Sequence, residues 1–328
     1  MAASDGRPGR ILVLKLGALG NVVLSLGPFA AIRRHHPAAH ITLLTLRPYA
    51  GWLAEAPWFD AVWIDRRPEW WDIPGTWALR RRLLDGRFDR VYDLQTSSRS
   101  SRYFRLFPHG ARPEWSGIAA GASHPDVDPD RDWLHDIDRQ FGQLRFAGIT
   151  GRQPPDLSWA YGDIDRFALP KRLALLVPGC SPRRPAKRWP AERYGVVAAQ
   201  LVKHGITPVV LGGAAEHGLA ETICAAAPTS VNLTRQTTMG DLASLARAAS
   251  LAIGNDTGPM HLIAAAGCRS VVLFSKHSEP ALCAPRGLDV QVLQRPDLTR
   301  LEPSDVLSAS SLHEADDRGR MAPFPRAG

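Results

Sequence analysis

Short apolar runs rich in Val, Ile and Leu alternate with stretches of helical periodicity along this chain of 328 residues. In the first half, strands are predicted at 10–16, 40–46, 60–65 and 90–95, and a helix at 21–37 that stops at its final proline. Nearly continuous apolar strands separated by helices are typical of parallel sheets that are covered on both faces. The chain is therefore predicted to be an α/β protein with doubly wound sheets.

The same alternation restarts after residue 170. Strands are predicted at 173–179, 207–213, 230–234, 251–256 and 270–275, with helices at 191–205, 214–227, 238–249 and 258–267. A chain of this length suits two domains rather than a single core. We expect two doubly wound domains in tandem, with ligands bound beyond the carboxyl ends of the strands.

The middle of the chain separates these two patterns. Residues 110–160 are rich in Pro, Gly, Trp and Asp and are predicted to hold long loops with one helix near 131–148, and residues 151–170 are interpreted as a linker. We predict an N-terminal domain over 1–160, a C-terminal domain over 161–312 and a flexible tail over 313–328.

The charge and the cysteine content limit which kinds of partner and metal are expected. The formal net charge is +8, and residues 66–105 hold ten Arg against five acidic residues. Such an excess suits phosphates, an anionic membrane surface or nucleic acid, and it also serves plain solubility; no nucleic-acid recognition motif is found, so nucleic acid is not expected. The four cysteines show no CxxC spacing, and neither zinc nor another metal is expected.

No apolar run is long enough to span a membrane. The apolar N-terminal stretch contains Lys15 and is broken by Gly17 and Gly20, which indicates a first strand rather than a signal peptide. A cytoplasmic location is expected.

The strongest local signal is "IGNDTGPMHLIAAAG" at 253–267. A strand ends there, and a helix begins with a proline at its first position, which makes an anion site from unpaired amides and the helix dipole. The Thr257 hydroxyl and the Gly258 amide suit a diphosphate, and His261 could donate to a phosphate. Asp256 would repel phosphate and is expected to cap the helix or bind a sugar hydroxyl. A capped core helix without a ligand fits the spacing equally well.

Two further loops follow predicted strands of the second half. In "PGCSPRRPAKRWPAERY" (178–194), Gly179 permits close backbone approach, Ser181 offers a hydroxyl and Lys187 offers a point charge for phosphate. In "LGGAAEHGLAETI" (211–223), Gly213 ends a strand and Glu216 begins a helix, where a carboxylate could accept from both ribose hydroxyls. Alone, these features are also typical of a solvated basic loop and of ordinary helix capping. Together, phosphate-competent loops at successive strand ends favour a nucleotide site.

A dinucleotide dehydrogenase is a less suitable interpretation. The first turn, "GALG" at 17–20, lacks the G-x-G-x-x-G pattern, and Arg47 and Pro48 stand after the second strand where an acid is needed.

These stretches, with "ILVLKLGALGNVVLSLGPFAAIRRHHPAAHITLLT" (11–45), "FDRVYDLQTSSRSS" (88–101) and "VVLGGAAEH" (209–217), resemble glycosyltransferase family 9, the heptosyltransferases of lipopolysaccharide core assembly. The resemblance implies a GT-B fold, in which two doubly wound Rossmann-like domains face each other across a cleft. It implies that the N-terminal domain binds an envelope glycolipid acceptor and the C-terminal domain an ADP-sugar donor. It further implies inverting transfer without a metal or cofactor. Separately from the resemblance, Arg80, Arg81 and Arg82 could meet anionic lipid headgroups or core phosphates at the inner face of the cytoplasmic membrane, and a solvated helix face explains these arginines equally well.

The resemblance also implies roles for single residues. Lys187 matches a lysine near the donor phosphates, and Glu216 matches the acid at the nucleotide ribose. The donor motif matches Asp256, Thr257, Gly258 and His261. Asp93 begins a "DLQ" that lines the cleft in the family.

Asn21 falls where the family usually has an aspartate that deprotonates the acceptor hydroxyl. An asparagine can orient that hydroxyl but cannot take its proton. Three explanations stay open: an attenuated or purely binding relative, a base role taken over by Asp93, and an introduced substitution that traps substrates.

Overall fold

The computed structural model describes residues 9–69, 71–181 and 184–310. The chain divides into two compact units. Among the described residues, the first unit runs to Gly162 and also takes in Met239–Ala243 and Ala281–Arg286. The second comprises Asp163–Thr238, Ser244–Pro280 and the residues from Gly287 onward. The predicted tail at 313–328 lies outside the described residues.

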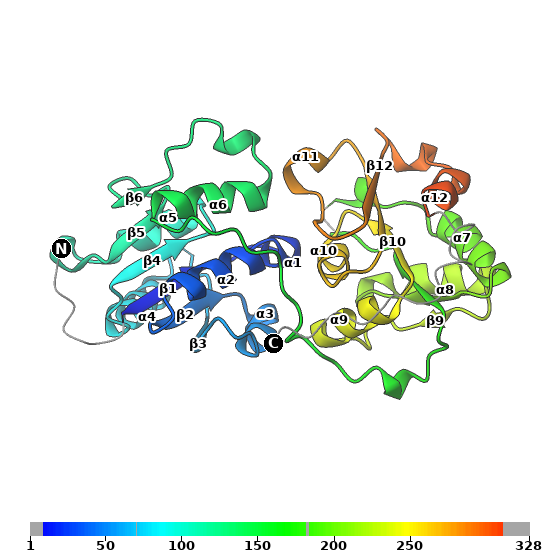
Figure 1. The fold of residues 1–328 in the computed structure, drawn as a ribbon, viewed down its shortest axis with the longest axis horizontal. Helices are drawn as coiled ribbons and strands as arrows, with labels where there is room; N and C mark the ends of the chain where they lie inside the picture. Colours follow the sequence, from blue (N-terminus) through cyan, green and yellow to red (C-terminus); the bar gives the residue numbers. More distant parts are fainter. Residues whose placement is uncertain (1–8, 70, 182–183, 311–328) are drawn as a thin grey trace. The chain divides into compact units, whose positions relative to one another are not determined.

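The first unit is built on a parallel sheet (Figure 1). Its strands in the described part are β1 (Arg10–Leu14), β2 (His40–Thr45), β3 (Ala61–Ile64), β4 (Arg90–Asp93), β5 (Glu114–Gly117) and β6 (His124–Pro125). They lie in the order β3-β2-β1-β4-β5-β6, and every neighbouring pair is parallel. The chain order reverses between β1 and β4, so the carboxyl ends of these two strands form the switch point at which such sheets bind ligands.

Helices connect these strands. They are α1 (Leu19–Val23), α2 (Leu26–His35), α3 (Arg47–Ala54), α4 (Ile73–Asp85), α5 (Ser98–Phe104) and α6 (Asp136–Phe146). Leu83 of α4 and Tyr103 of α5 pack in one buried cluster with Leu12 and Leu14 of β1. The alternate β1 residues point to the opposite face and are also buried, so the strand has no solvent-exposed face.

The second unit repeats the same plan. Its described strands are β7 (Leu173–Val177), β8 (Thr207–Val210), β9 (Val231–Asn232), β10 (Leu251–Asn255), β11 (Ser270–Phe274) and β12 (Val290–Gln294). They lie in the order β12-β11-β10-β7-β8-β9, again all parallel. The switch point of this sheet lies between β7 and β10.

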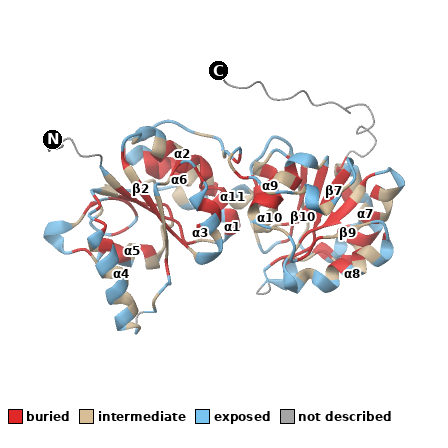
Figure 2. Cartoon of the chain, turned by 90° about the horizontal axis from the view of Figure 1, so that it is seen from below, coloured by how far each residue is buried: buried red, intermediate tan, exposed pale blue. Residues whose placement is uncertain are grey.

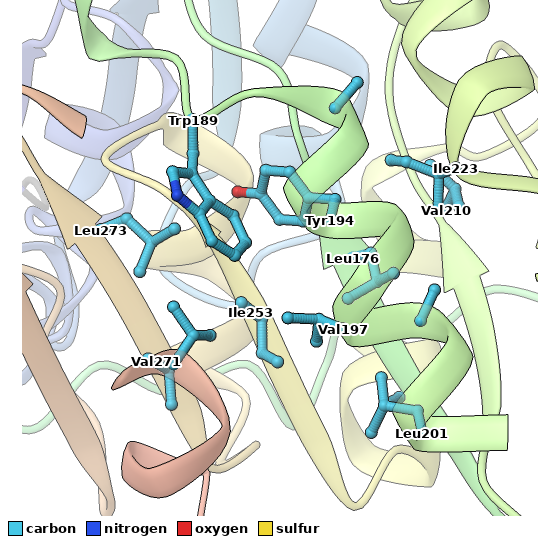
Figure 3. Packing of buried hydrophobic residues seen from close by; sticks show 14 of the residues in the cluster. Leu176, Trp189, Tyr194, Val197, Leu201, Val210, Ile223, Ile253, Val271 and Leu273 are labelled. Atoms are coloured by element: carbon cyan, nitrogen blue, oxygen red, sulfur yellow. The ribbon is translucent and has the colours of Figure 1, made fainter. Parts of the chain in front are cut away.

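The helices that follow these strands are α7 (Ala191–Lys203), α8 (His217–Ala226), α9 (Met239–Ala248), α10 (Gly258–Ala265), α11 (Pro280–Cys283) and α12 (Pro303–Ala309). All of them except α11 bury apolar residues; α11 buries none, and its residues from Ala281 onward belong to the first unit. In α7, Tyr194, Val197 and Leu201 recur at helical spacing and are fully buried against the sheet (Figure 3). The chain leaves α7 through Gly205, whose φ of 67° is left-handed and favours glycine.

The strand predictions in both halves are confirmed, and the structure corrects three expectations. The helix predicted at 21–37 is two helices, because the chain turns at Leu24 and Ser25. The region 110–160 was predicted as loops with one helix, yet it also contributes β5 and β6. The edge strand β12 was missed altogether. These three strands are short or partly exposed at the sheet edge and carry no strong apolar run, which explains why periodicity does not reveal them.

Within the part of the chain that the structure describes, no helix combines the length and the apolar character needed to cross a membrane.

Candidate active site

Most of the residues singled out from the sequence lie at the switch point of each sheet, while Gly213 and Glu216 follow the neighbouring strand β8. In the first unit, Asn21 follows β1 and Asp93 ends β4, and Asp93 pairs in register with Leu14 of β1. In the second unit, Gly179 follows β7 and Asp256 follows β10. The carboxyl ends of neighbouring parallel strands meet at one edge, so each unit gathers its candidate residues at one place.

Asn21 lies on α1 with its side chain exposed. The loop before it contains Gly17, where an added Cβ would stand 2.9 Å from the Asn21 Cβ, so a larger residue would push against position 21. The Ser25 hydroxyl lies 2.8 Å from the Asn21 backbone oxygen and 2.7 Å from Gln140 Oε1, which ties α1 to α6. The backbone at position 21 is thus held from two sides, while its amide faces solvent.

Asp93, the second candidate for the base, is buried at the end of β4. Its side chain has no exposed surface, and its Oδ1 accepts from the backbone N–H groups of Gln95 (3.1 Å) and Thr96 (3.0 Å). Burial raises the pKa of Asp93 to about 6, against the opposing effect of these hydrogen bonds. In this structure Asp93 holds the turn after β4, and its carboxylate has no exposed surface with which to meet a substrate hydroxyl.

The turn after β4 also holds the loop that follows β1. Leu16 N donates to Gln95 Oε1 at 2.8 Å, and Lys15 Nζ donates to the Leu94 carbonyl oxygen at 3.0 Å. Burial lowers the pKa of Lys15 to about 8, with the charge of Asp136 acting in the opposite direction. The "DLQ" motif at 93–95 therefore positions the loop between β1 and α1, and Asn21 lies on α1 just after this loop.

In the second unit, a polar cluster forms around Asp256. Its Oδ2 lies 2.6 Å from Lys187 Nζ and 2.6 Å from Ser278 Oγ, and its Oδ1 lies 4.0 Å from His261 Nε2. Of the two roles expected for Asp256, helix capping is not observed, because Thr257 is the N-cap residue of α10, and binding of a sugar hydroxyl stays a prediction. Asp256 instead orients Lys187, from the loop after β7, at the end of β10.

The N-terminus of α10 keeps the features expected of an anion site. Thr257 makes no capping hydrogen bond with its side chain, and a proline stands in the first turn after Gly258. The first amides of a helix have no partner within it. The Thr257 hydroxyl and these amides are therefore available to an incoming oxyanion.

Two loops of the second unit, those after β7 and β8, meet at Glu216. Its Oε2 accepts from Gly213 N at 2.8 Å. A Cβ added at Gly179 would stand 2.7 Å from Glu216 Cγ, and one added at Gly212 would stand 2.6 Å from Glu216 Cβ. Glycine at 179 and 212 thus leaves the room that the Glu216 side chain occupies. Ser181 is exposed in its loop, and the two residues after it lie outside the described residues.

Asn255, which was not assigned a role from the sequence, joins two of these loops. Its fully buried side chain accepts from Trp189 N (3.1 Å) and Tyr194 Oη (3.1 Å) and donates to the Pro178 carbonyl oxygen (2.7 Å). Trp189 and Tyr194 pack edge to face beside it, with ring centroids 4.8 Å apart (Figure 3). The sequence did offer a signal for this role, namely an asparagine at the end of a buried strand, directly before Asp256. A buried amide needs several hydrogen-bond partners, so such a residue is expected to join neighbouring loops.

Among the described residues, no group of three or more His, Cys, Asp or Glu side chains is arranged to hold a metal ion.

Two doubly wound α/β units, each with polar loops at its switch point, define the GT-B class of two-domain folds. A solved family 9 glycosyltransferase from Veillonella parvula matches with a TM-score of 0.78 at 22% identity, covering 94% of this chain and 98% of that one. The E. coli heptosyltransferase WaaC with ADP matches with a TM-score of 0.73 at 20% identity, over 91% and 98% of the two chains.

The family follows from the sequence comparison. The model of glycosyltransferase family 9 (heptosyltransferase) matches residues 76–295, and the chain belongs to this family. It is 26% identical over 311 residues to lipopolysaccharide heptosyltransferase 2 of Escherichia coli, covering 87% of this chain and 88% of that protein. It is 23% identical over 300 residues to the lipopolysaccharide core heptosyltransferase OpsX of Haemophilus influenzae, over 85% and 82% of the two.

Proposed function

We propose that this protein transfers a heptose or a related sugar from an ADP-sugar to a glycolipid acceptor of the lipopolysaccharide core, with inversion at the anomeric carbon and without a metal. The observation that carries the proposal is the convergence of three strand-end loops of the second unit on Glu216, Lys187 and Asp256. The family of the chain supplies the substrate class.

The second unit holds the donor in this proposal. The α10 amides, the Thr257 hydroxyl and Lys187 bind the diphosphate, and His261 donates to it from the first turns of α10. Glu216 accepts from the ribose hydroxyls with its carboxylate. As the bond between the anomeric carbon and the phosphate oxygen breaks, these donors stabilise the negative charge that develops on ADP.

The first unit presents the acceptor in this proposal. The acceptor hydroxyl oxygen forms the new bond to the anomeric carbon from the side opposite ADP, and it loses its proton in the same step. Asn21 accepts a hydrogen bond from this hydroxyl and orients it. An amide does not take the proton, so the proton passes to solvent, and the chemical step is slower than with a carboxylate, which contributes about 10²–10⁴-fold to such steps.

A specific observation favours a second function, a binding relative without turnover. Asn21 is exposed where the family usually places its base, and Asp93 is fully buried. Binding of an ADP-sugar without release of ADP in the presence of acceptor would support this second function.

The experiment that tests the first function combines two measurements. Calorimetry with ADP compares the native chain with Glu216→Gln, and mass spectrometry detects a heptose added to a deacylated core acceptor. We expect ADP binding that weakens in the variant, and an acceptor product of increased mass. Failure of ADP to bind the native chain contradicts both functions.

A further inference from the structure

Seven of the 13 residues of helix α4 are exposed and five are half-buried. Of its 13 residues only Leu83 is buried, whereas α7, which also has 13 residues, buries six. Figure 2 draws α4 mostly in the colours of intermediate and exposed residues. Helices in proteins gain most of their stability from an amphipathic face that packs on a core, and α4 packs on the core through Leu79, Leu83 and Leu84. Its outer face therefore requires a separate explanation.

This outer face is apolar at its start. Ile73 is 74% exposed and Trp77 is 58% exposed, and Trp71, just before the helix, is 63% exposed. Ile73, Trp77 and Arg81 are spaced four residues apart, so they form one stripe along the helix. Exposed large apolar side chains that occur singly need no explanation, but three within seven residues mark an interaction surface.

The same surface is cationic. Residues 66–87 contain six Arg against three acidic residues. The Arg81 guanidinium lies 5.8 Å from the centroid of the Trp77 ring, and that of Arg82 lies 4.4 Å from the centroid of the Trp63 ring. These four side chains line a hollow of about 350 Å³ together with Arg10. Tryptophan beside arginine is the composition of protein surfaces at the boundary between membrane and water.

The position of α4 in the first unit is suitable for contact with a membrane surface. It is the helix that follows β3 in the chain, after a connection over 65–72, so its N-terminal end with Ile73 comes from the carboxyl edge of the first sheet, the edge at which Asn21 follows β1. A helix of 13 residues is about 20 Å long and can lie flat on a surface along its whole length.

We propose that α4 docks the first unit on an anionic phospholipid bilayer. Ile73 and Trp77 enter the headgroup layer, and Arg81 and Arg82 contact lipid phosphates. The proposal deepens the proposed function, since a glycolipid acceptor is held in a bilayer. Binding to vesicles is measured without any sugar transfer. A failure of docking can therefore be distinguished from a failure of the transfer reaction.

The test is flotation of the full chain with vesicles of phosphatidylglycerol and phosphatidylethanolamine, beside vesicles of phosphatidylcholine alone. We expect the native chain to bind the anionic vesicles, and less so in high salt. The variant Ile73→Ser with Trp77→Ser should bind at least about tenfold more weakly, and Arg81→Glu at least about fivefold more weakly. The matched controls are Trp133→Ser, whose tryptophan is 81% exposed in the same unit, and the exposed Lys171→Glu. Both controls should bind as the native chain does.

Transfer assays add a second readout. The α4 variants should keep their turnover with a deacylated acceptor in solution and lose it with acceptor held in vesicles. Unchanged flotation of both α4 variants, equal binding to zwitterionic vesicles, or no binding by the native chain would each overturn the proposal. Thermal unfolding of the variants, compared with the native chain, checks whether these surface substitutions leave the fold intact.

Discussion

The ammonium group of Lys187 lies 2.6 Å from the carboxylate of Asp256, and the two side chains are only 11% and 8% exposed. This pair explains how an aspartate could stand beside the proposed diphosphate site, because the charge of its carboxylate is already neutralised by Lys187. It also fixes a flexible lysine before the donor arrives, so less conformational entropy is lost on binding.

Lys187→Met should cost both stability and donor binding. Removing one partner of a buried ion pair leaves an uncompensated charge, at a cost of about 3–5 kcal/mol. The double variant with Asp256→Asn should regain much of the free energy of unfolding but not the affinity for ADP. Denaturant unfolding and calorimetry separate these two effects. Equal ADP affinity of Lys187→Met and the native chain would show that the lysine does not meet the phosphates.

Glu216→Gln should weaken ADP binding about tenfold with little change in stability. The amide oxygen can still accept from Gly213 N, so the local packing is kept, while the charged acceptor for the ribose hydroxyls is lost. Calorimetry with ADP and with inorganic pyrophosphate checks this. Since pyrophosphate has no ribose, its affinity should be unchanged, and a parallel loss for both ligands would contradict the ribose role.

Asn255→Leu should be strongly destabilising. The substitution leaves Trp189 N, Tyr194 Oη and the Pro178 carbonyl oxygen without their buried partner, and each such group costs about 1–3 kcal/mol. Thermal unfolding compares this variant with Val196→Ala, an exposed position on α7. A loss no larger than that of the control would mean that Asn255 does not hold these loops together.

Asp93 makes stability depend on pH. Its pKa is raised to about 6, so the folded chain keeps this proton to higher pH than the unfolded chain. Free energy of unfolding therefore falls as pH rises from about 4 to about 6, by about 2–3 kcal/mol from this group. Asp93→Asn should remove this component and keep acceptor-dependent turnover. Loss of turnover in a well-folded Asp93→Asn protein would instead restore Asp93 as a base.

Much of this organisation follows from sequence patterns. Runs such as that of β10 are apolar and continuous, because both faces of the strand are buried, and the glycine and proline after it mark the turn into α10. The burial of Asp93 was not predictable, because it depends on the fold that brings α6 beside β4. There the Gln143 side chain donates to the Asp93 carbonyl oxygen, a contact that the local sequence does not show. Nor was Ser278 predictable as a partner of Asp256, because 22 residues separate them and only the fold brings them together.

The central claim is most directly tested by measuring ADP release from ADP-heptose, with and without a deacylated core acceptor, for the native chain beside Asn21→Asp. The account predicts slow release by the native chain that depends on acceptor, and release by the aspartate variant that is faster by about 10²–10⁴-fold. Release no faster in the aspartate variant, or independent of acceptor in both chains, would contradict it.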